Sequence, residues 1–334
     1  MERKKMKALT FSKFGTPEVL EYIDVSIPEL EKETVLVKMK AIGLNYADIY
    51  RRKGNYHLKG TPPFIAGYEG AGVVVKSNSE KYKVGDKIAF TDVPFANAEF
   101  VLVPVAHVIR LSSEIDFSLA ASVLLQGLTA HYLSSDSYKV AAGDTILIHA
   151  ASGGVGQILT QFCKLKGAKV IGLTRDSDKL NTILSNKADY AVLLDENWKQ
   201  RIMEITNNKG IDVVYDSIGA TLLDSFEVTK ERGTVVFYGM SGGDPKPIDP
   251  RMLMDTSKVL IGGDLWSYLT SEEERNNRAK QLFDLILSGA IVIKDSIIFK
   301  LSEGKQAHQY LENGKSSSKI LLIPDSEYPL SEFL

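Results

Sequence analysis

A glycine-rich turn, AASGGVG, has the residue types and spacing of a site for a dinucleotide. It follows an apolar run at 145–149 and opens a stretch of helical spacing, which ends before a second apolar run at 169–174. Gly153 and Gly156 occupy the second and third glycine positions of a G-x-G-x-x-G pattern, and Ala151 replaces the first. Glycines let the backbone turn sharply, so that a pyrophosphate approaches amide N–H groups at the positive end of a helix. The alternative is an ordinary tight turn.

The end of the second apolar run decides between NAD and NADP. An acidic side chain there accepts hydrogen bonds from the ribose hydroxyls and repels a 2′-phosphate. Thr174 and Arg175 stand at this point, with Lys179 about one helical turn later. One hydroxyl and two cations favour NADPH. Asp176 and Asp178 leave NAD open as the alternative, and both also suit the N-cap of the next helix.

A second stretch, AGYEGAGVV at 66–74, places a tyrosine and a glutamate between glycines before an apolar run. Glu69 could ligate a metal, Tyr68 could act as an acid, or the stretch could simply turn a corner. Metal ligands are scarce, because Cys163 is the single cysteine and the five histidines lie singly without ligand spacing. A zinc site of several cysteines is therefore excluded. Cys163 lies inside a predicted helix, and we interpret it as a core residue.

Length, charge and hydropathy narrow the class of protein. The chain has 334 residues, enough for two domains, with 40 basic and 42 acidic residues and a formal net charge of −2. This balance argues against a nucleic-acid surface. No stretch reaches the ~20 apolar residues of a membrane span, and the basic start MERKKMKALTF lacks the apolar core of a signal peptide. We therefore expect a cytoplasmic protein without a membrane partner, and a single cysteine fits a reducing compartment.

The elements that position these residues change in type along the chain. Before about Ser118, short apolar or alternating runs separated by Gly, Pro and Asp predict an irregular β region. Beyond it, strand and helix patterns alternate, which predicts an α/β fold with a doubly wound parallel sheet. A polar run from a Ser271 N-cap to Gly289 predicts a helix, and the tail returns to a β pattern. The predicted parallel strands are 145–149, 169–174, 190–194, 212–216, 234–238 and 259–261.

Five motifs occur in a fixed order: AIGLNYADIYRRKGNY, AGYEGAGVV, QGLTAHYL, HAASGGVG and DSIG. Together they resemble the zinc-independent quinone oxidoreductases, the zeta-crystallin-like branch of the medium-chain dehydrogenase/reductase superfamily. The resemblance extends from Met6 to Pro324. It implies a Rossmann doubly wound parallel sheet that binds NADP, at 125–264, and a GroES-like, mainly β catalytic domain, formed by 1–124 and completed by 265–334.

The resemblance also indicates chemistry without a metal. Zinc-dependent members of the superfamily hold their catalytic zinc with a cysteine at the position of Asn45 and a histidine at the position of Tyr68. Glu69 alone falls short of the three protein ligands of a catalytic zinc, and the cysteine-rich lobe that binds structural zinc in those relatives is missing. Without a Lewis acid, hydride delivery to a quinone, enone or enal stays feasible, whereas alcohol oxidation does not. We interpret Glu69 as structural, bound to nearby backbone amides or to a cation from the turn.

By the same resemblance, Asn45 lies near the nicotinamide, and Tyr50 and Tyr56 line the substrate site. Tyr56 matches the position of a candidate proton donor in related enoyl reductases, and a phenol can donate a hydrogen bond to a developing oxyanion. Each residue has a plainer interpretation. The two tyrosines could only pack, and Asn45 could only cap the helix that begins NYADIY.

The remaining cofactor contacts follow the family residue by residue. Two departures stand out: Leu194 replaces a tyrosine that often holds the adenine end, and Gln126 replaces a lysine just before GLTA. Lys319 begins the final strand, where it could reach a cofactor phosphate or lie in solvent. The implied contacts are Thr129 with the cofactor, Ser152, Gly153, Gly154 and Val155 with the phosphates, Arg175 and Lys179 with the 2′-phosphate, and Ser217, Tyr238, Gly239 and Ser241 with the far half of the site.

These observations predict an NADPH-dependent reductase of quinones or enones. The alternatives are a 2-alkenal or enoyl-thioester reductase, and a non-catalytic NADPH-binding regulatory or structural protein. The family's usual dimer pairs the last Rossmann strand across a two-fold axis, which is KVLIGG in this chain. We therefore expect a homodimer, with a tetramer as the alternative.

Overall fold

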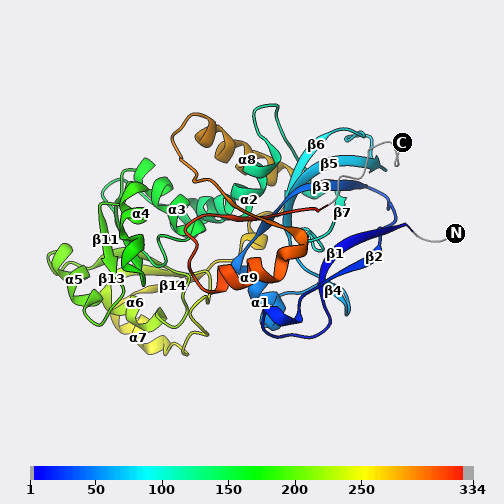
Figure 1. Cartoon of the computed structure of the whole chain (residues 1–334). Helices are drawn as coiled ribbons and strands as arrows, with labels where there is room; N and C mark the ends of the chain where they lie inside the picture. The colour runs from blue at the N-terminus through cyan, green and yellow to red at the C-terminus, as the bar shows by residue number, and fades with distance from the viewer. Residues whose placement is uncertain (1–3, 326–334) are drawn as a thin grey trace. The chain divides into compact units, whose positions relative to one another are not determined.

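The computed structural model describes residues 4–325 (Figure 1). Six parallel strands form one sheet in the order β11-β10-β9-β12-β13-β14. The chain starts in the middle, at β9, runs outward to β11, and then returns to build the other half. This order confirms the predicted doubly wound sheet. It also places a switch point beside β9, where ligands bind at the carboxyl ends of the strands. The strands are β9 Thr145–Ile148, β10 Lys169–Thr174, β11 Tyr190–Leu193, β12 Ile211–Asp216, β13 Thr229–Phe237 and β14 Val259–Gly262.

One predicted strand boundary differs from the structure by more than one residue. Strand β13 begins at Thr229, not at 234, and Thr229 pairs with Ile211 before the register shifts. Three charged residues, 230–232, occupy exposed positions in this part of the strand. Their charge conceals the strand in the sequence, because an exposed strand segment carries no apolar pattern.

Helices flank the six-stranded sheet and bury its faces. Leu147, Ile171 and Val214, from three neighbouring strands, are fully buried. Trp198 and Phe226 pack against them from α5 and α6. Burial on both faces explains the short, nearly continuous apolar runs of these strands. The helices are α2 Phe117–Tyr132, which continues into a π-helical turn Leu133–Ser137, α3 Gly154–Leu165, α4 Leu180–Ser185, α5 Trp198–Ile205, α6 Leu222–Val228 and α7 Pro250–Thr256.

The described chain divides into two compact units, and each unit is built from segments that are not continuous in the sequence. The unit with the six-stranded sheet comprises Gln126–Tyr268 and Asp284–Ile293. The other unit comprises the described residues up to Leu125, Leu269–Phe283 and the described residues from Lys294 onward.

The second unit is mainly β and is organised around β3. Strand β3 pairs antiparallel with β5, β7 and β16. Because β16 lies near the end of the described chain, the C-terminal segment completes a sheet that begins near the N-terminus. This agrees with the GroES-like part of the expected fold. The larger sheet contains β3 Thr34–Leu44, β5 Glu69–Ser77, β6 Lys87–Thr91, β7 Phe100–Pro104, β8 Ile109–Arg110, β15 Ile297–Lys300 and β16 Ile320–Ile323, and a smaller sheet contains β1 Lys5–Phe11, β2 Glu21–Ser26 and β4 Phe64–Ile65.

Three further helices are α1 Tyr46–Lys53, α8 Glu272–Leu287 and α9 Gly304–Glu312. The Ser271 hydroxyl accepts a hydrogen bond from the Glu274 N–H at 3.1 Å, so the predicted cap of α8 is confirmed. Helix α9 corrects the prediction of a tail with only β structure. It is short, and its buried face includes Ala307 and His308, so it gives little helical signal in the sequence. Within residues 4–325, no helix is long and apolar enough to cross a bilayer.

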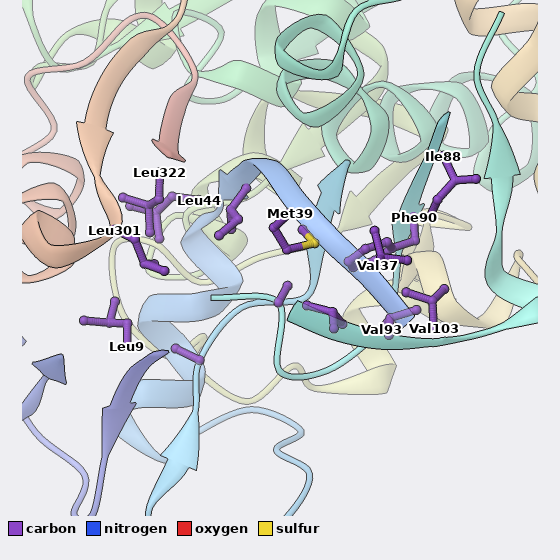
Figure 2. Close-up of a cluster of buried hydrophobic side chains, with 14 of the residues drawn as sticks. Leu9, Val37, Met39, Leu44, Ile88, Phe90, Val93, Val103, Leu301 and Leu322 are labelled. Carbon is purple, nitrogen blue, oxygen red and sulfur yellow. The ribbon is translucent and has the colours of Figure 1, made fainter. Parts of the chain in front are cut away.

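An apolar cluster runs along β3 and joins distant segments (Figure 2). Figure 2 shows Val37, Met39 and Leu44 spaced along this strand, with Phe90 near Val37 and Leu322 near Leu44. All five side chains are buried. The cluster therefore fixes the end of β3 against the start of β16, which is where Asn45 and Lys319 lie.

Candidate functional site

The glycine-rich turn lies between β9 and α3, as predicted. Gly153 stands at the N-cap of α3, and its N–H donates to the Ala150 carbonyl at 2.8 Å. The first intrahelical bond there runs from the Gln157 N–H to the Gly153 carbonyl, at 2.9 Å. Helix α3 begins at Gly154, so the N–H groups of its first turn, including that of Val155, are those that an α-helix leaves without an intrahelical acceptor. This arrangement suits an anion.

Close packing explains the glycines and the single alanine of the turn. A Cβ on Gly156 would lie 2.5 Å from the Ala150 carbonyl oxygen and 2.7 Å from the Ala151 Cα. The helix could then not approach the strand. The alanine that replaces the first glycine finds room because Gly172, on β10, lacks a side chain: a Cβ there would lie 2.7 Å from the Ala151 Cβ. The departure from the glycine pattern is therefore compensated on the neighbouring strand.

Hydrogen bonds tie the turn to the end of β10. The Ser152 hydroxyl donates to the Thr174 hydroxyl at 3.3 Å, and the Gln157 side-chain N–H donates to the Ser152 carbonyl at 2.8 Å. Gln126, one of the departures from the family, packs onto the turn from α2, because a Cβ on Gly154 would collide with its amide. Ser152 and Thr174 thus lie at one edge of the sheet.

The cations that follow β10 have different surroundings. Arg175 is exposed and makes no ion pair with any residue from 4 to 325. Lys179 is half-buried, with its Nζ 4.0 Å from an Asp176 carboxylate oxygen. Burial lowers the pKa of Lys179, as does Arg175, while Asp176 raises it. The Asp176 side chain also accepts from the Asp178 N–H at 3.0 Å, which confirms its N-cap interpretation.

The structure brings together the four residues predicted for the far half of the site. Both the N–H and the hydroxyl of Ser241 donate to the Ser217 carbonyl, each at 3.0 Å. Gly239 also lies close to Ser217, because a Cβ on Gly239 would be 3.2 Å from the same carbonyl oxygen. The Tyr238 phenol hydrogen-bonds the Ser217 side chain, and burial raises its pKa well above the usual value. These residues follow the carboxyl ends of β12 and β13, where a ligand of a doubly wound sheet is expected.

A buried carboxylate that the sequence reasoning missed organises this edge. Asp216 accepts through Oδ1 from the Ile218 N–H at 2.8 Å and the Gly219 N–H at 3.1 Å. Its Oδ2 accepts from the Ser225 hydroxyl at 2.7 Å, and that hydroxyl lies 3.0 Å from His149 Nε2. The motif DSIG contains Asp216, but its partners Ser225 and His149 lie on other elements, so the motif alone did not indicate the network.

In the mainly β unit, Asn45 stands at the N-cap of α1. The Asp48 carboxylate accepts from the Asn45 N–H at 2.9 Å, so the predicted capping position is correct. The Asn45 side chain turns elsewhere: its Nδ2 donates to Glu69 Oε2 at 2.8 Å and to the Gly43 carbonyl at 3.3 Å. Its Oδ1 accepts from Lys319 Nζ at 2.7 Å.

Glu69 and Lys319 form a buried ion pair at the same place. Lys319 Nζ lies 2.7 Å from Glu69 Oε2, and Glu69 Oε1 accepts from the Leu125 N–H at 2.6 Å. The side chains of Lys319 and Glu69 are 2% and 0% exposed. Glu69 therefore binds a backbone amide and a cation, as expected, but neither comes from its own turn. Lys319 is not solvated, which corrects that alternative.

Tyr68 lies in a cation–π contact at the corner. The Arg51 guanidinium carbon is 3.5 Å from the centroid of its ring, and the Tyr68 hydroxyl accepts from the Lys59 N–H at 3.1 Å. Burial raises the pKa of the Tyr68 phenol, although Arg51 opposes the shift. Arg51 also pairs with Asp48 at 3.2 Å. Tyr68 thus stabilises the turn, and its hydroxyl is already bonded to the backbone.

The predicted substrate-side tyrosines lie next to each other. The ring centroids of Tyr50 and Tyr56 are 6.2 Å apart in an edge-on arrangement, and Tyr46 adds a third ring 5.6 Å from Tyr50. The Arg51 guanidinium carbon lies 5.0 Å from the centroid of Tyr56. Both Tyr50 and Tyr56 are half-buried.

The predicted site residues fall into two groups, one in each unit. Asn45, Tyr50 and Tyr56 belong to the mainly β unit, and the other predicted contacts belong to the unit with the six-stranded sheet. Thr129 lies in α2 and is buried, and Leu194 packs against the apolar core of its sheet.

The structure also bears on the role of Cys163 and on the possibility of a metal site. Cys163 is fully buried in α3, and burial raises the pKa of its thiol far above the usual value, which agrees with a core residue. Across residues 4–325, no group of three or more His, Cys, Asp or Glu side chains could hold a metal ion.

Comparison with known proteins covers nearly the whole chain. Residues 31–113 match the family described as alcohol dehydrogenase GroES-like domain, and residues 154–286 match the family described as zinc-binding dehydrogenase. Quinone oxidoreductase of Pseudomonas aeruginosa is 35% identical over 95% of this chain and 99% of its own. The 2-haloacrylate reductase of a Burkholderia species is 31% identical over 96% and 99%.

A solved structure is similar over the same extent. The crystal structure of Escherichia coli quinone oxidoreductase complexed with NADPH has a TM-score of 0.92 and 32% identity, covering 95% of this chain and 100% of that one.

Proposed function

The chain belongs to the quinone oxidoreductases of the medium-chain dehydrogenase/reductase superfamily, and we propose that it reduces quinones or similar conjugated carbonyl acceptors with NADPH, without zinc. The residues at the positions of the relatives' zinc ligands carry the proposal. Asn45 is bonded to Glu69 and Lys319, and Tyr68 is bonded to Lys59 and covered by Arg51. An amide and a phenol with these partners do not make the donor set of a catalytic zinc. An acceptor that is already electrophilic needs no such metal.

The cofactor part of the proposal rests on the turn before α3. We assign the pyrophosphate to the segment Ser152, Gly153, Gly154 and Val155, and the 2′-phosphate to Arg175 and Lys179. Asn45 is assigned to the nicotinamide and Thr129 to a further contact with the cofactor. The far half of the site is assigned to Ser217, Tyr238, Gly239 and Ser241. Bound NADPH supplies the hydride, and these residues bind and orient it. The domain assignment is 125–264 for NADP binding and 1–124 with 265–334 for the substrate.

A proton must also reach the acceptor oxygen, and Tyr56 is our candidate donor. Its phenol lies beside Tyr50, and the Arg51 guanidinium faces its ring, which favours negative charge near the phenol oxygen. Replacement Tyr56→Phe should lower kcat with little change in KM for the quinone. An unchanged kcat would show that Tyr56 only packs.

NADPH oxidation with different acceptors tests the activity. We expect turnover with 9,10-phenanthrenequinone and 1,4-benzoquinone. Turnover with enals alone would favour a 2-alkenal or enoyl-thioester reductase, and turnover with 2-chloroacrylate would follow the 2-haloacrylate reductase relative. Tight NADPH binding without turnover on any acceptor would favour a regulatory or structural protein.

We also propose a homodimer in a reducing, cytoplasmic setting. Strand β14 is the last strand of its sheet, and Val259 on it is 44% exposed, so an apolar strand edge is open to pairing with a second copy. Light scattering after size-exclusion chromatography should give twice the chain mass, and a monomer mass would contradict this. Cell fractionation tests the location.

A further inference from the structure

The side-chain amide of Asn45 is held between two partners of opposite hydrogen-bonding chemistry. The Lys319 ammonium only donates, and the Glu69 carboxylate only accepts. Lys319 Nζ lies 2.7 Å from Asn45 Oδ1, and Glu69 Oε2 lies 2.8 Å from Asn45 Nδ2. A half-turn of the amide would place donor against donor and acceptor against acceptor. The two contacts therefore permit one orientation of the amide.

The hydrogen-bonding capacity of Asn45 is nearly filled in this orientation. Both N–H groups of Nδ2 have acceptors, Glu69 Oε2 at 2.8 Å and the Gly43 carbonyl at 3.3 Å. The oxygen Oδ1 accepts one bond from Lys319 and has a second lone pair. Towards a ligand, Asn45 can then serve only as an acceptor.

The backbone builds this arrangement. Ile320 lies opposite Leu44 in the antiparallel pair of β16 and β3, so the residue before Ile320, Lys319, meets the residue after Leu44, Asn45. Gly43 leaves space for the carboxylate, because a Cβ there would collide with Glu69 Oε2. The strand register and a glycine thus create the place for the buried pair.

We propose that Lys319 and Glu69 are positioning residues that lock the Asn45 amide, with the free lone pair of Oδ1 directed to the ligand. This inference rests on the proposed function, in which Asn45 lies near the nicotinamide. The complementary ligand group is an N–H or O–H, and the nicotinamide carboxamide carries such an N–H. The reduced 3-acetylpyridine analogue of NADP has a ketone in its place and lacks the donor.

A double variant, Glu69→Gln with Lys319→Met, should reverse the lock. The new amide at position 69 keeps its oxygen towards the Leu125 N–H and turns its nitrogen to Asn45. Asn45 can then rotate, so that Oδ1 faces position 69 and Nδ2 faces the ligand, and only the long 3.3 Å bond from Nδ2 to the Gly43 carbonyl opposes this rotation. Because both charges are removed together, no unpaired buried charge remains to unfold the protein.

The affinities of the two reduced cofactors, measured by fluorescence titration, test this reversal. The natural chain should bind NADPH about three- to tenfold more tightly than the acetylpyridine analogue, as expected for one hydrogen bond. The double variant should lose or reverse that preference. A control double variant, Glu99→Gln with Lys38→Met, removes another buried acid and lysine from the same unit and should keep it. The same preference in the natural chain and the Glu69→Gln/Lys319→Met variant would overturn the proposal.

An NMR measurement without cofactor tests the fixed orientation of the Asn45 amide independently of the proposed function. In protein labelled with 15N-asparagine, the Asn45 side-chain resonances are assigned by their loss in Asn45→Ala. Both amide protons should exchange slowly in the natural chain and faster in the Glu69→Gln/Lys319→Met variant, which keeps no unpaired buried charge. Fast exchange in the natural chain would overturn the lock. Slow exchange in a protein that binds neither cofactor would support the lock and contradict the proposed function.

Discussion

Lys319 Nζ lies 2.7 Å from Glu69 Oε2, although 250 residues separate the two in the chain. The second carboxylate oxygen of Glu69 is bonded to the Leu125 N–H, and the Lys319 ammonium also reaches Asn45. The positive charge that faces the buried Glu69 carboxylate is therefore supplied by the Lys319 side chain.

Removal of Lys319 alone should destabilise the protein strongly. Lys319→Met leaves the Glu69 carboxylate buried without its cation, and breaking such a pair lowers the free energy of unfolding by about 3–5 kcal/mol. The Glu69→Gln/Lys319→Met variant should lose less, because neither charge remains. Urea unfolding measures both. Lys81→Met, which removes an exposed pair with Glu272, is the control and should change stability little. Equal losses for the single and double variants would contradict a buried ion pair.

Replacement of Arg175 should change cofactor preference. Arg175→Asp places a negative charge where the 2′-phosphate is proposed to bind, so NADPH affinity should fall about tenfold or more, while NADH affinity stays the same or rises. Fluorescence titration with both cofactors measures this. Arg251→Asp, on α7, offers a matched charge change at an exposed arginine and should leave both affinities unchanged. Unchanged NADPH affinity in Arg175→Asp would show that the 2′-phosphate does not bind at Arg175.

Asp216 should matter for cofactor binding through the turn that follows β12. Asp216→Asn replaces one acceptor oxygen by a donor, so either the two bonds from Ile218 and Gly219 or the two bonds from Thr221 and Ser225 are lost. We expect a loss of about 1–3 kcal/mol in the free energy of unfolding, together with weaker NADPH binding. Asp224→Asn, on α6, is the control at an exposed carboxylate. If stability fell while NADPH affinity stayed the same, Asp216 would support the sheet without positioning the turn.

Stability should fall on mild acidification because of His308. Burial, together with the Arg52 guanidinium, lowers the pKa of His308 to about 3. The folded protein therefore keeps this imidazole neutral, whereas the unfolded chain protonates it below about pH 6.5. The contribution is complete above about pH 6.5 and is lost as the pH falls towards 3, which amounts to about 2 kcal/mol between pH 6.5 and 5.

Urea unfolding at pH 7.5 and pH 5 checks the role of His308. His308→Asn should reduce the difference between the two pH values by about 2 kcal/mol. His57→Asn, at an exposed histidine, is the control and should leave it unchanged. The same pH dependence in the His308 variant and the natural chain would show that other groups account for it.

The sequence by itself determined the fold of the unit with the six-stranded sheet. Apart from the central pair of β9 and β12, the strands at 145–262 pair with neighbours that follow one another in the chain, and each buried strand leaves a short apolar run. The glycine pattern before α3 and the Ser271 cap of α8 are local as well, so sequence spacing was sufficient to predict them. The order of five motifs was sufficient to identify the family, which the comparisons confirm.

Only the tertiary structure decided the partners of the buried polar groups. Nothing near Lys319 in the sequence indicates Glu69 or Asn45, because their contact depends on the register of β16 against β3. Likewise, Ala151 fits only because Gly172 lies on the neighbouring strand. Charge and size are local properties of a residue, but burial and hydrogen-bond partners arise when distant segments pack, so these assignments had to await the fold.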